Sequence, residues 1–239
     1  MSTEPEPDAA PVTLITGASS GIGEAAVRRL LAAGHRVVAT GRDEKKLAAA
    51  VQAWDAGDRV LGVAGDAGDW DAVRGAVEAT VAAFGRLDNA IANAGFSTPG
   101  NVATGDPDRW REMVLTNVLG PSLLIKAALP ELKRTRGRIV LVGSVAGFKN
   151  TPGNLYSMTK WAVTALAENT RMLVTKDGVG VTLLAPGRVQ TPFWADRPSE
   201  NTGPILASEH IADTIAWVVA QPPGVDINTV VVRPQGQAN

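Results

Sequence analysis

A tyrosine and a lysine four positions apart are the residues of this sequence best suited to proton transfer. Tyr156 is the only tyrosine in the chain, and Lys160 follows it in a YxxxK pattern. On a helix this spacing places both side chains on one face, within reach of each other. A phenol with a pKa of about 10 is a poor acid or base at neutral pH, but a neighbouring ammonium favours the phenolate and lowers that pKa. The pair therefore predicts a general acid and base, although surface helices often carry the same spacing without any chemistry.

A glycine-rich turn is the second feature with chemical meaning. The segment from Thr16 to Gly23 follows an apolar run and opens a helical pattern, with the spacing GxxxGxG. Glycines between a strand and a helix allow a tight turn and a close approach of a pyrophosphate, which the N–H groups of the helix start can bind. A purely structural turn is the alternative, since the spacing differs from the usual GxGxxG.

Short apolar runs alternate with longer helical patterns, and these elements must position both features. The runs are almost continuously apolar, which is typical of parallel strands covered on both faces. We expect strands at 12–16, 36–40, 59–64, 87–92, 137–143, 180–185 and 229–232. We expect helices at 24–33, 43–54, 69–84, 106–131 and 155–176. The alternation predicts an α/β fold, a Rossmann-type doubly wound sheet of seven parallel strands with helices on both faces.

The ends of the helices carry their own signals. Asp43, Asp69 and Asp106 stand where they can cap helix starts, and Gly34 and Gly85 stand where helices should end. We expect residues 1–10, which are acidic and rich in proline, to form a disordered tail. No linker divides the rest, so we expect one domain over 11–239, with an irregular segment at 190–207.

Composition excludes several classes of function. The chain has 239 residues, no cysteine, only two histidines and a net charge of −1. These values argue against a disulfide scaffold, a metal site, a Ser-His triad and a nucleic-acid partner. We see no apolar run as long as a membrane span and no signal peptide, so we expect a cytoplasmic protein.

The order of motifs resembles the short-chain dehydrogenase/reductase family, in its short single-domain branch, from Val12 to Gln237. The resemblance implies that the glycine turn binds the cofactor through Gly17, Ser19, Ser20, Gly21, Ile22 and Gly23. It also implies that Ser144 stabilises the substrate oxygen and that Tyr156 exchanges the proton. Lys160 would assist Tyr156 and hold the ribose, and the backbone carbonyl of Asn117 would hold a water that links Lys160 to solvent. A solvated helix residue is the alternative for Asn117.

Further matches to the family lie after the third, fourth and sixth strands. Asp66 and Ala67 match the adenine contacts, although Asp66 could instead cap a helix. Asn93, Ala94 and Gly95 match the NAG motif that lines the cofactor. The PGxVxT segment would fix the carboxamide and a phosphate through Pro186, Gly187, Val189 and Thr191.

The end of the second strand favours NADP(H) over NAD(H). An acid at the position of Gly41 would select NAD, whereas Arg42 can clamp a 2′-phosphate with paired hydrogen bonds. A solvated arginine is the alternative. Family members with strong NADP preference often carry a second basic residue in the glycine turn, where this chain has Ser19 and Ser20, so the preference can be incomplete.

A substrate pocket is expected around the catalytic residues, under a lid at 190–207. Ser144 and Tyr156 are 12 positions apart rather than the family's more usual 13, which implies a shortened loop between Phe148 and Leu155. The aromatic residues favour an apolar substrate, but Arg188 could pair with a carboxylate and Trp194 could pack against another subunit. The expected substrate contacts are Ser144, Phe96, Phe148, Asn150, Arg188, Phe193 and Trp194, with Gly147 and Gly153 beside them.

The resemblance therefore implies an NADP(H)-dependent ketone or aldehyde reductase with a small carbonyl or alcohol substrate. The C-terminal part resembles 3-hydroxy acid and serine dehydrogenases and reductases of secondary metabolism, so an oxidative dehydrogenase is an alternative. A non-catalytic NADP-binding sensor is an alternative of another class, although such proteins tend to lose the tyrosine or lysine. A dehalogenase-type lyase would replace the lysine by arginine. Family members are usually homotetramers or homodimers that pair through the helices expected at 106–131 and 155–176.

Overall fold

Seven parallel strands form one sheet in the computed structural model, which describes residues 10–195 and 203–237. The strand order is β3-β2-β1-β4-β5-β6-β7, and every adjacent pair is parallel. The strands are β1 Val12–Ile15, β2 Arg36–Gly41, β3 Val60–Ala64, β4 Asn89–Ala92, β5 Arg138–Val142, β6 Gly180–Pro186 and β7 Thr229–Val232. The predicted seven-stranded Rossmann-type sheet is confirmed. The tail expected at 1–10 lies outside the described residues except for its last position.

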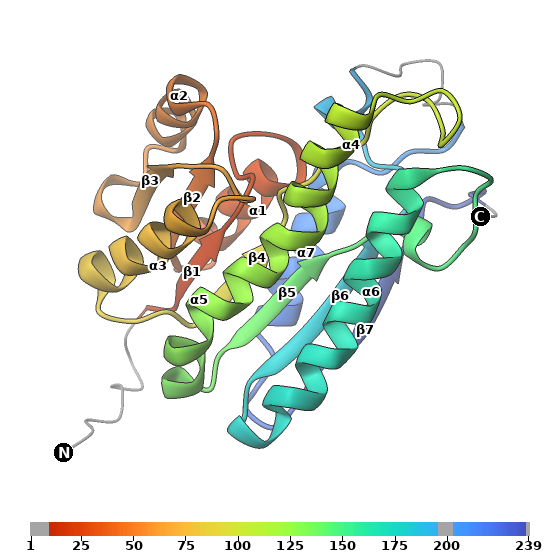
Figure 1. Ribbon diagram of the computed structural model, residues 1–239. Helices are drawn as coiled ribbons and strands as arrows, with labels where there is room; N and C mark the ends of the chain where they lie inside the picture. The colour runs from red at the N-terminus through yellow and green to blue at the C-terminus, as the bar shows by residue number, and fades with distance from the viewer. Residues whose placement is uncertain (1–9, 196–202, 238–239) are drawn as a thin grey trace.

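Helices cover both faces of the sheet. Figure 1 shows α3 Trp70–Phe84, α5 Gly120–Thr135 and α6 Leu155–Val174 in front of the sheet. Behind it lie α1 Gly21–Ala32 and α7 Ser208–Val219 (Figure 1), and α2 Glu44–Trp54 packs into the same core layer as these two. The order of the strands reverses between β1 and β4, so the two halves of the sheet wind outward in opposite directions.

Two apolar layers hold the helices to the sheet. Neighbouring residues of β1 belong to different layers: Leu14 packs with α3, α5 and α6, and Ile15 packs with α1, α2 and α7. All four residues of β1 are buried, as are all five of β5. A strand covered on both faces is apolar at most of its positions, which explains the nearly continuous apolar runs of the sequence.

The predicted helix caps are present. The side chains of Asp43, Asp69 and Asp106 accept hydrogen bonds from the backbone N–H groups of Lys46, Ala72 and Asp108 at 2.9, 2.8 and 3.0 Å. Each thereby satisfies one of the free donors at a helix start. Gly85 ends α3 with a left-handed φ of 73°, as its position in the sequence predicts.

The helix expected at 106–131 is longer than predicted and is interrupted. It runs as α4 Pro107–Val114, a π-helical turn Leu115–Leu119, and α5. The N–H of Gly120 donates to the carbonyl of Leu115, five residues back. A π-helical turn shifts the register of the backbone hydrogen bonds, and such turns are frequent at functional sites.

This interrupted helix also corrects an expectation about membranes. By length and composition alone, Pro107–Thr135 is long and apolar enough to cross a membrane in one 18-residue window. In that window 44% of the residues are buried inside this fold. Since α5 packs on the sheet, burial in a protein core explains its apolar face.

The expected lid at 190–207 is described only at its two ends. A short 3₁₀ turn, Pro192–Trp194, follows β6, and an isolated parallel bridge joins Val189 to Leu206. Residues 196–202, in the middle of the expected lid, lie outside the described part of the chain.

Candidate active site

A cleft of about 720 Å³ runs along the carboxyl edge of the sheet. The loops after β1 to β6 line it, which is where ligands bind in open parallel sheets. Most of the expected site residues line this cleft: Gly17, Ser19, Ser20, Gly21, Ile22, Arg42, Asp66, Ala67, Asn93, Ala94, Gly95, Phe96, Ser144, Tyr156, Lys160, Pro186, Gly187, Arg188, Val189, Thr191, Phe193 and Trp194. The fold thus gathers residues from six loops into a single site.

Four expected residues do not line the cleft. A Cβ at Gly23 would lie 2.6 Å from Nδ2 of Asn93, so this glycine allows the start of α1 to pack closely. Asn117 is buried beneath the cleft. Phe148 and Asn150 are exposed on the loop after β5, and as substrate contacts they stay predictions.

The glycine turn is shaped for a close ligand. Gly17 and Gly21 have φ angles of +65° and +57°, which side chains rarely adopt. A Cβ at Gly17 would lie 2.8 Å from Cα of Ala94. The side-chain amide of Asn93 donates to the backbone carbonyls of Thr16 and Gly17 at 3.0 Å each, so the loop after β4 holds the turn in place. The backbone there is left open for a phosphate group at the start of α1.

Tyr156 and Lys160 lie on the first turns of α6. The helix start is capped by Asn154, whose Oδ1 accepts from the N–H of Ser157 at 2.7 Å. Nζ of Lys160 lies 5.8 Å from the centre of the Tyr156 ring and donates to the carbonyl of Val142 at 2.8 Å. Burial lowers the pKa of Lys160 to about 8, because an ammonium loses its hydration there. The lysine is thus held rigidly beside the phenol, as the spacing predicts.

Ser144 lies at the end of β5 in the same cleft. Its Oγ accepts from the N–H of Ala146 at 3.1 Å and so begins the 3₁₀ turn Val145–Gly147. A Cβ at Gly147 would lie 2.6 Å from the carbonyl of Lys160, which means that this turn packs directly on α6. Ser144 and Tyr156 both line the cleft, and since Oγ of Ser144 accepts from Ala146, its hydroxyl proton is available to a ligand.

Asn117 lies in the π-helical turn and is 1% exposed. Its side chain accepts from the N–H of Phe96 at 3.0 Å and donates to the carbonyl of Phe96 at 2.8 Å. It also donates to Oγ1 of Thr159 at 3.1 Å. The side chain therefore ties the loop after β4 to α6, so any contact with a ligand falls to the backbone of this residue.

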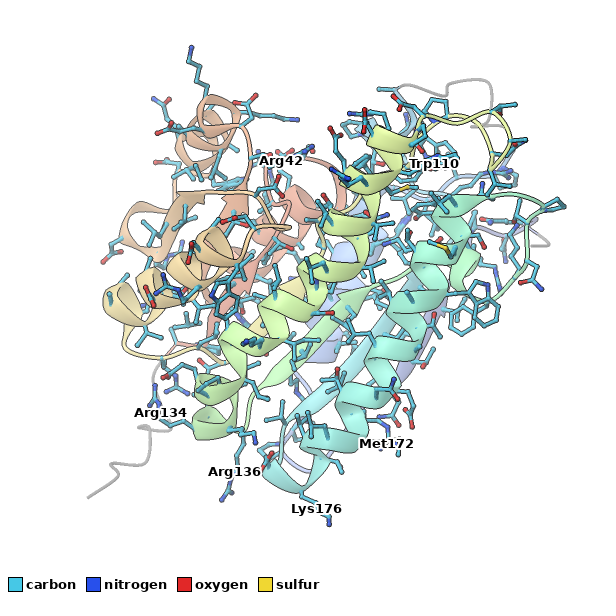
Figure 2. All side chains as sticks on the ribbon, in the orientation of Figure 1. Arg42, Trp110, Arg134, Arg136, Met172 and Lys176 are labelled. Carbon is cyan, nitrogen blue, oxygen red and sulfur yellow. The ribbon has the colours of Figure 1, made fainter. Side chains whose placement is uncertain are left out.

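Two basic side chains line the cleft near the end of β2. Arg42 and Lys46 are both exposed there, and the carboxylate of Asp43 is engaged by the N–H of Lys46. Figure 2 shows Arg42 at the upper edge of the sheet, near α4. Sequence reasoning missed Lys46, although its position four residues after Arg42 on a helix start was a usable signal.

Phe96 lines the cleft and contacts two guanidiniums. Cζ of Arg42 lies 5.8 Å from the ring centre, and Cζ of Arg109 from α4 lies 5.5 Å from it. Arg109 is also paired with Glu112 at 2.8 Å. These contacts give Phe96 a part in positioning Arg42 that the sequence did not suggest.

Aromatic rings line the cleft around Tyr156. The rings of Tyr156 and Phe193 are 5.3 Å apart, and those of Phe193 and Trp194 are 5.2 Å apart. Nε1 of Trp194 donates to the carbonyl of Val189 at 3.0 Å, which fixes this ring to the loop after β6. An apolar wall therefore stands next to the candidate proton donor.

Further lining residues were missed in the sequence. Lys149, Thr151 and Asn154 come from the loop after β5, and Gln237 comes from the end of the chain. Oε1 of Gln237 accepts from the N–H of Arg188 at 2.9 Å. Only the cap position of Asn154 could have been read from the sequence, because the contact of Gln237 depends on the path of the chain after β7. Within 10–195 and 203–237, no cluster of acids and histidines could hold a metal ion.

Comparison with known proteins gives a family and relatives of similar length. A family model described as short chain dehydrogenase matches residues 11–202. An uncharacterized oxidoreductase of Staphylococcus saprophyticus is 34% identical over 232 residues, covering 93% of this chain and 97% of its own length.

Solved structures resemble the whole fold. An alcohol dehydrogenase from the archaeon Thermococcus sibiricus, complexed with 5-hydroxy-NADP, matches with a TM-score of 0.88 and 28% identity over 96% of this chain and 99% of its own. A metagenomic short-chain oxidoreductase in complex with NADP matches with a TM-score of 0.82 and 31% identity, covering 95% of this chain and 97% of its own. A 3-ketoacyl-(acyl-carrier-protein) reductase from Brucella melitensis, complexed with NADH, matches with a TM-score of 0.85 and 27% identity over 94% of this chain and 97% of its own.

Proposed function

The chain belongs to the short-chain dehydrogenase family, and on that basis we propose that it transfers a hydride between NADP(H) and a small carbonyl or alcohol compound. In the reducing direction it acts as a ketone or aldehyde reductase. The observation that carries this proposal is that Ser144, Tyr156 and Lys160 line the same cleft as the glycine turn. The cleft therefore holds a candidate proton donor, a group that can bind the substrate oxygen, and a turn that can bind phosphate.

The cleft suits a dinucleotide. Its volume of about 720 Å³ lies within the roughly 300–1,000 Å³ usual for small-molecule sites. The absence of side chains at Gly17 and Gly21, together with the N-terminus of α1, supports a pyrophosphate at that end. When bound, the nicotinamide supplies the hydride to the carbonyl carbon.

The side chains of Tyr156, Ser144 and Lys160 each have a separate role in proton transfer. Tyr156 donates its phenolic proton to the carbonyl oxygen, and Ser144 donates a hydrogen bond to the same oxygen as negative charge develops there. The ammonium of Lys160 favours the phenolate that remains. The backbone carbonyl of Asn117 holds a water that returns a proton from solvent, a role that the change of hydrogen-bond register in its π-helical turn supports. Oxidation of an alcohol follows the same path in reverse.

The preference for NADP(H) rests on charge. Arg42 and Lys46 place two cations beside the end of β2, and Gly41 leaves no carboxylate at the position that selects NAD. The solved relatives that bind NADP or its 5-hydroxy derivative add support, while the Brucella melitensis reductase holds NADH. Asp66, Ala67, Asn93, Ala94 and Gly95 complete the adenosine side. Pro186, Gly187, Val189 and Thr191 complete the nicotinamide side.

The direct test follows the absorbance of NADPH during incubation with a panel of ketones and aldehydes. The proposal expects NADPH oxidation with at least one carbonyl compound, and a lower KM for NADPH than for NADH. Tight binding of NADPH without oxidation by any member of the panel would favour a sensor instead. Faster turnover of 3-hydroxy acids or serine with NADP⁺ would favour the oxidative alternative.

Assembly into a homodimer or homotetramer, in the cytoplasm, belongs to the same proposal. Large apolar side chains are exposed on the π-helical turn and on α6: Leu115, Leu119, Met158, Trp161, Met172 and Leu173. Several large apolar side chains exposed on the same elements are a feature often found at interfaces between subunits. Light scattering after size exclusion gives the mass in solution, and a monomer would contradict this part of the proposal.

A further inference from the structure

We propose that the carbonyl substrate also bears an anionic group, which Lys149 and Arg188 bind at the catalytic end of the cleft. This inference rests on the proposed function and names the class of its substrate. Both residues line the same cleft as Tyr156 and Ser144. Lys149 follows β5 and Arg188 follows β6, and these two strands are neighbours in the sheet.

Both cations are carried on backbone that is held in place. The carbonyl of Lys149 accepts from Oγ of Ser157 at 3.0 Å and from Nε1 of Trp161 at 3.2 Å, which fixes it over the first turns of α6. The N–H of Arg188 donates to Gln237 at 2.9 Å, and its carbonyl accepts from the N–H of Leu206 at 2.9 Å. An ordered backbone confines the entropy lost on binding a charged group to the two long side chains.

The charges of the cleft are unevenly distributed. Asp43 and Asp66 are the only carboxylates among its described lining residues, and they follow β2 and β3, on the opposite half of the sheet. Lys149 and Arg188 are half-buried, and neither forms an ion pair with any residue in 10–195 or 203–237. Partly desolvated cations without counter-ions raise the local potential, and an anionic ligand offsets it.

The other cations of the cleft already have separate tasks in the proposed function. Arg42 and Lys46 lie at the 2′-phosphate position, and Lys160 serves Tyr156. The pyrophosphate is bound by the start of α1 in the same proposal. Lys149 and Arg188 are the two that the cofactor and the proton transfer leave unused. Since the rings of Phe193 and Trp194 line the same cleft, the site fits an oxo acid with an apolar body.

Matched pairs of ketones test this inference. One pair is 4-acetylbenzoate and its methyl ester, and the other is benzoylformate and its methyl ester, so that the carboxylate lies at two distances from the ketone. We expect kcat/KM for the acid to exceed that for the ester by about 10- to 100-fold in at least one pair, the range of a charge-assisted hydrogen bond. The methyl esters keep the ketone and the apolar body, remove the charge and add one methyl group. In methyl benzoylformate the ester beside the ketone also makes that carbonyl carbon more electrophilic, which favours the ester, so the 4-acetylbenzoate pair is the more direct measure of charge recognition.

Variants assign the effect to the two cations. Lys149→Met and Arg188→Met should each raise KM for the preferred acid by about tenfold or more, while KM for its ester and for NADPH stays within about twofold. Lys176→Met is the matched control, because Lys176 is exposed at the opposite end of the molecule (Figure 2). It should leave every one of these constants unchanged.

Three results would overturn the inference. Equal or better turnover of both esters would show that no charge is recognised, while the proposed reductase activity would stand. A rise in KM for NADPH, rather than for the acid, in either variant would assign these cations to the cofactor. Absence of NADPH oxidation with acids, esters and simple ketones alike would refute the proposed function itself, and the inference with it.

Discussion

At the scale of single residues, the role of Tyr156 as proton donor is the part of the proposed mechanism that a single substitution tests most directly. Tyr156→Phe removes the phenolic oxygen and keeps the ring, whose centre lies 5.3 Å from that of the tilted Phe193 ring. Loss of a general acid costs about 10²- to 10⁴-fold in rate, so kcat should fall by that amount while binding of NADPH is retained. Steady-state kinetics and NADPH fluorescence measure the two effects. Full activity in this variant would exclude Tyr156 as the donor.

Lys160 links the chemistry of the site to the stability of the fold. Its pKa falls from 10.5 in the unfolded chain to about 8 in the folded protein, because burial disfavours the ammonium. Between pH 8 and 10.5 Lys160 binds more protons in the unfolded state than in the folded state. The contribution of this residue to the free energy of unfolding therefore increases as the pH rises through that range. Below pH 8 both states are protonated, and the buried charge costs on the order of 3 kcal/mol.

We therefore expect Lys160→Met to lose activity but to unfold at a higher denaturant concentration than the wild type at pH 7. The stability difference between the two proteins should shrink as the pH rises from 8 to 10.5. Urea unfolding of both proteins at several pH values measures it. A wild type more stable than the variant at pH 7 would show that the hydrogen bond to Val142 outweighs the burial of the charge.

At the scale of elements, the turn between β1 and α1 depends on the absence of side chains. Gly17→Ala forces a left-handed φ of +65° on alanine and places its Cβ 2.8 Å from Cα of Ala94. We expect the Kd for NADPH to rise by at least about tenfold, since backbone strain of about 1–3 kcal/mol falls on the phosphate-binding turn.

Gly34→Ala is the control for this prediction. Gly34 also has a positive φ, of +88°, but a Cβ there would have no atom within 4 Å. This variant should lose some stability and keep its affinity for NADPH. Isothermal titration and thermal unfolding of both variants separate the two effects. Equal affinities in the two variants would show that the contact with Ala94 does not matter for the cofactor.

At the scale of the whole molecule, one buried histidine makes the stability of the fold sensitive to acid. Nδ1 of His35 lies 2.9 Å from Oγ1 of Thr13, and Oγ1 also accepts from Asn89 of β4 at 3.1 Å. Burial lowers the pKa of His35 below 6.5, and the charge of Asp88 opposes this only in part. As the pH drops below 6.5, the imidazole of His35 binds a proton in the unfolded chain, whereas in the folded protein it stays neutral until a lower pH. The stability of the fold therefore falls as the pH drops below 6.5.

His35→Gln should flatten the loss of Tm between about pH 6.5 and 5 relative to the wild type. His210→Gln is the control, because His210 is exposed on α7. Thermal unfolding at a series of pH values gives both curves. An unchanged slope in His35→Gln would assign the acid response to other groups.

The sequence by itself determined the seven strands, the helices up to residue 176, the caps, the glycine turn and the pairing of Tyr156 with Lys160, but it did not indicate α7. These features depend on residues within a turn or two of one another, where periodicity and cap chemistry act directly. Only the tertiary structure decided the π-helical turn at Asn117, because its register shift is not encoded in any local pattern. The same holds for Lys149 and Gln237, which reach the cleft only through the packing of the loop after β5 and the path of the chain after β7. Phe96 likewise became a partner of Arg42 and Arg109 through contacts between segments that lie apart in the sequence.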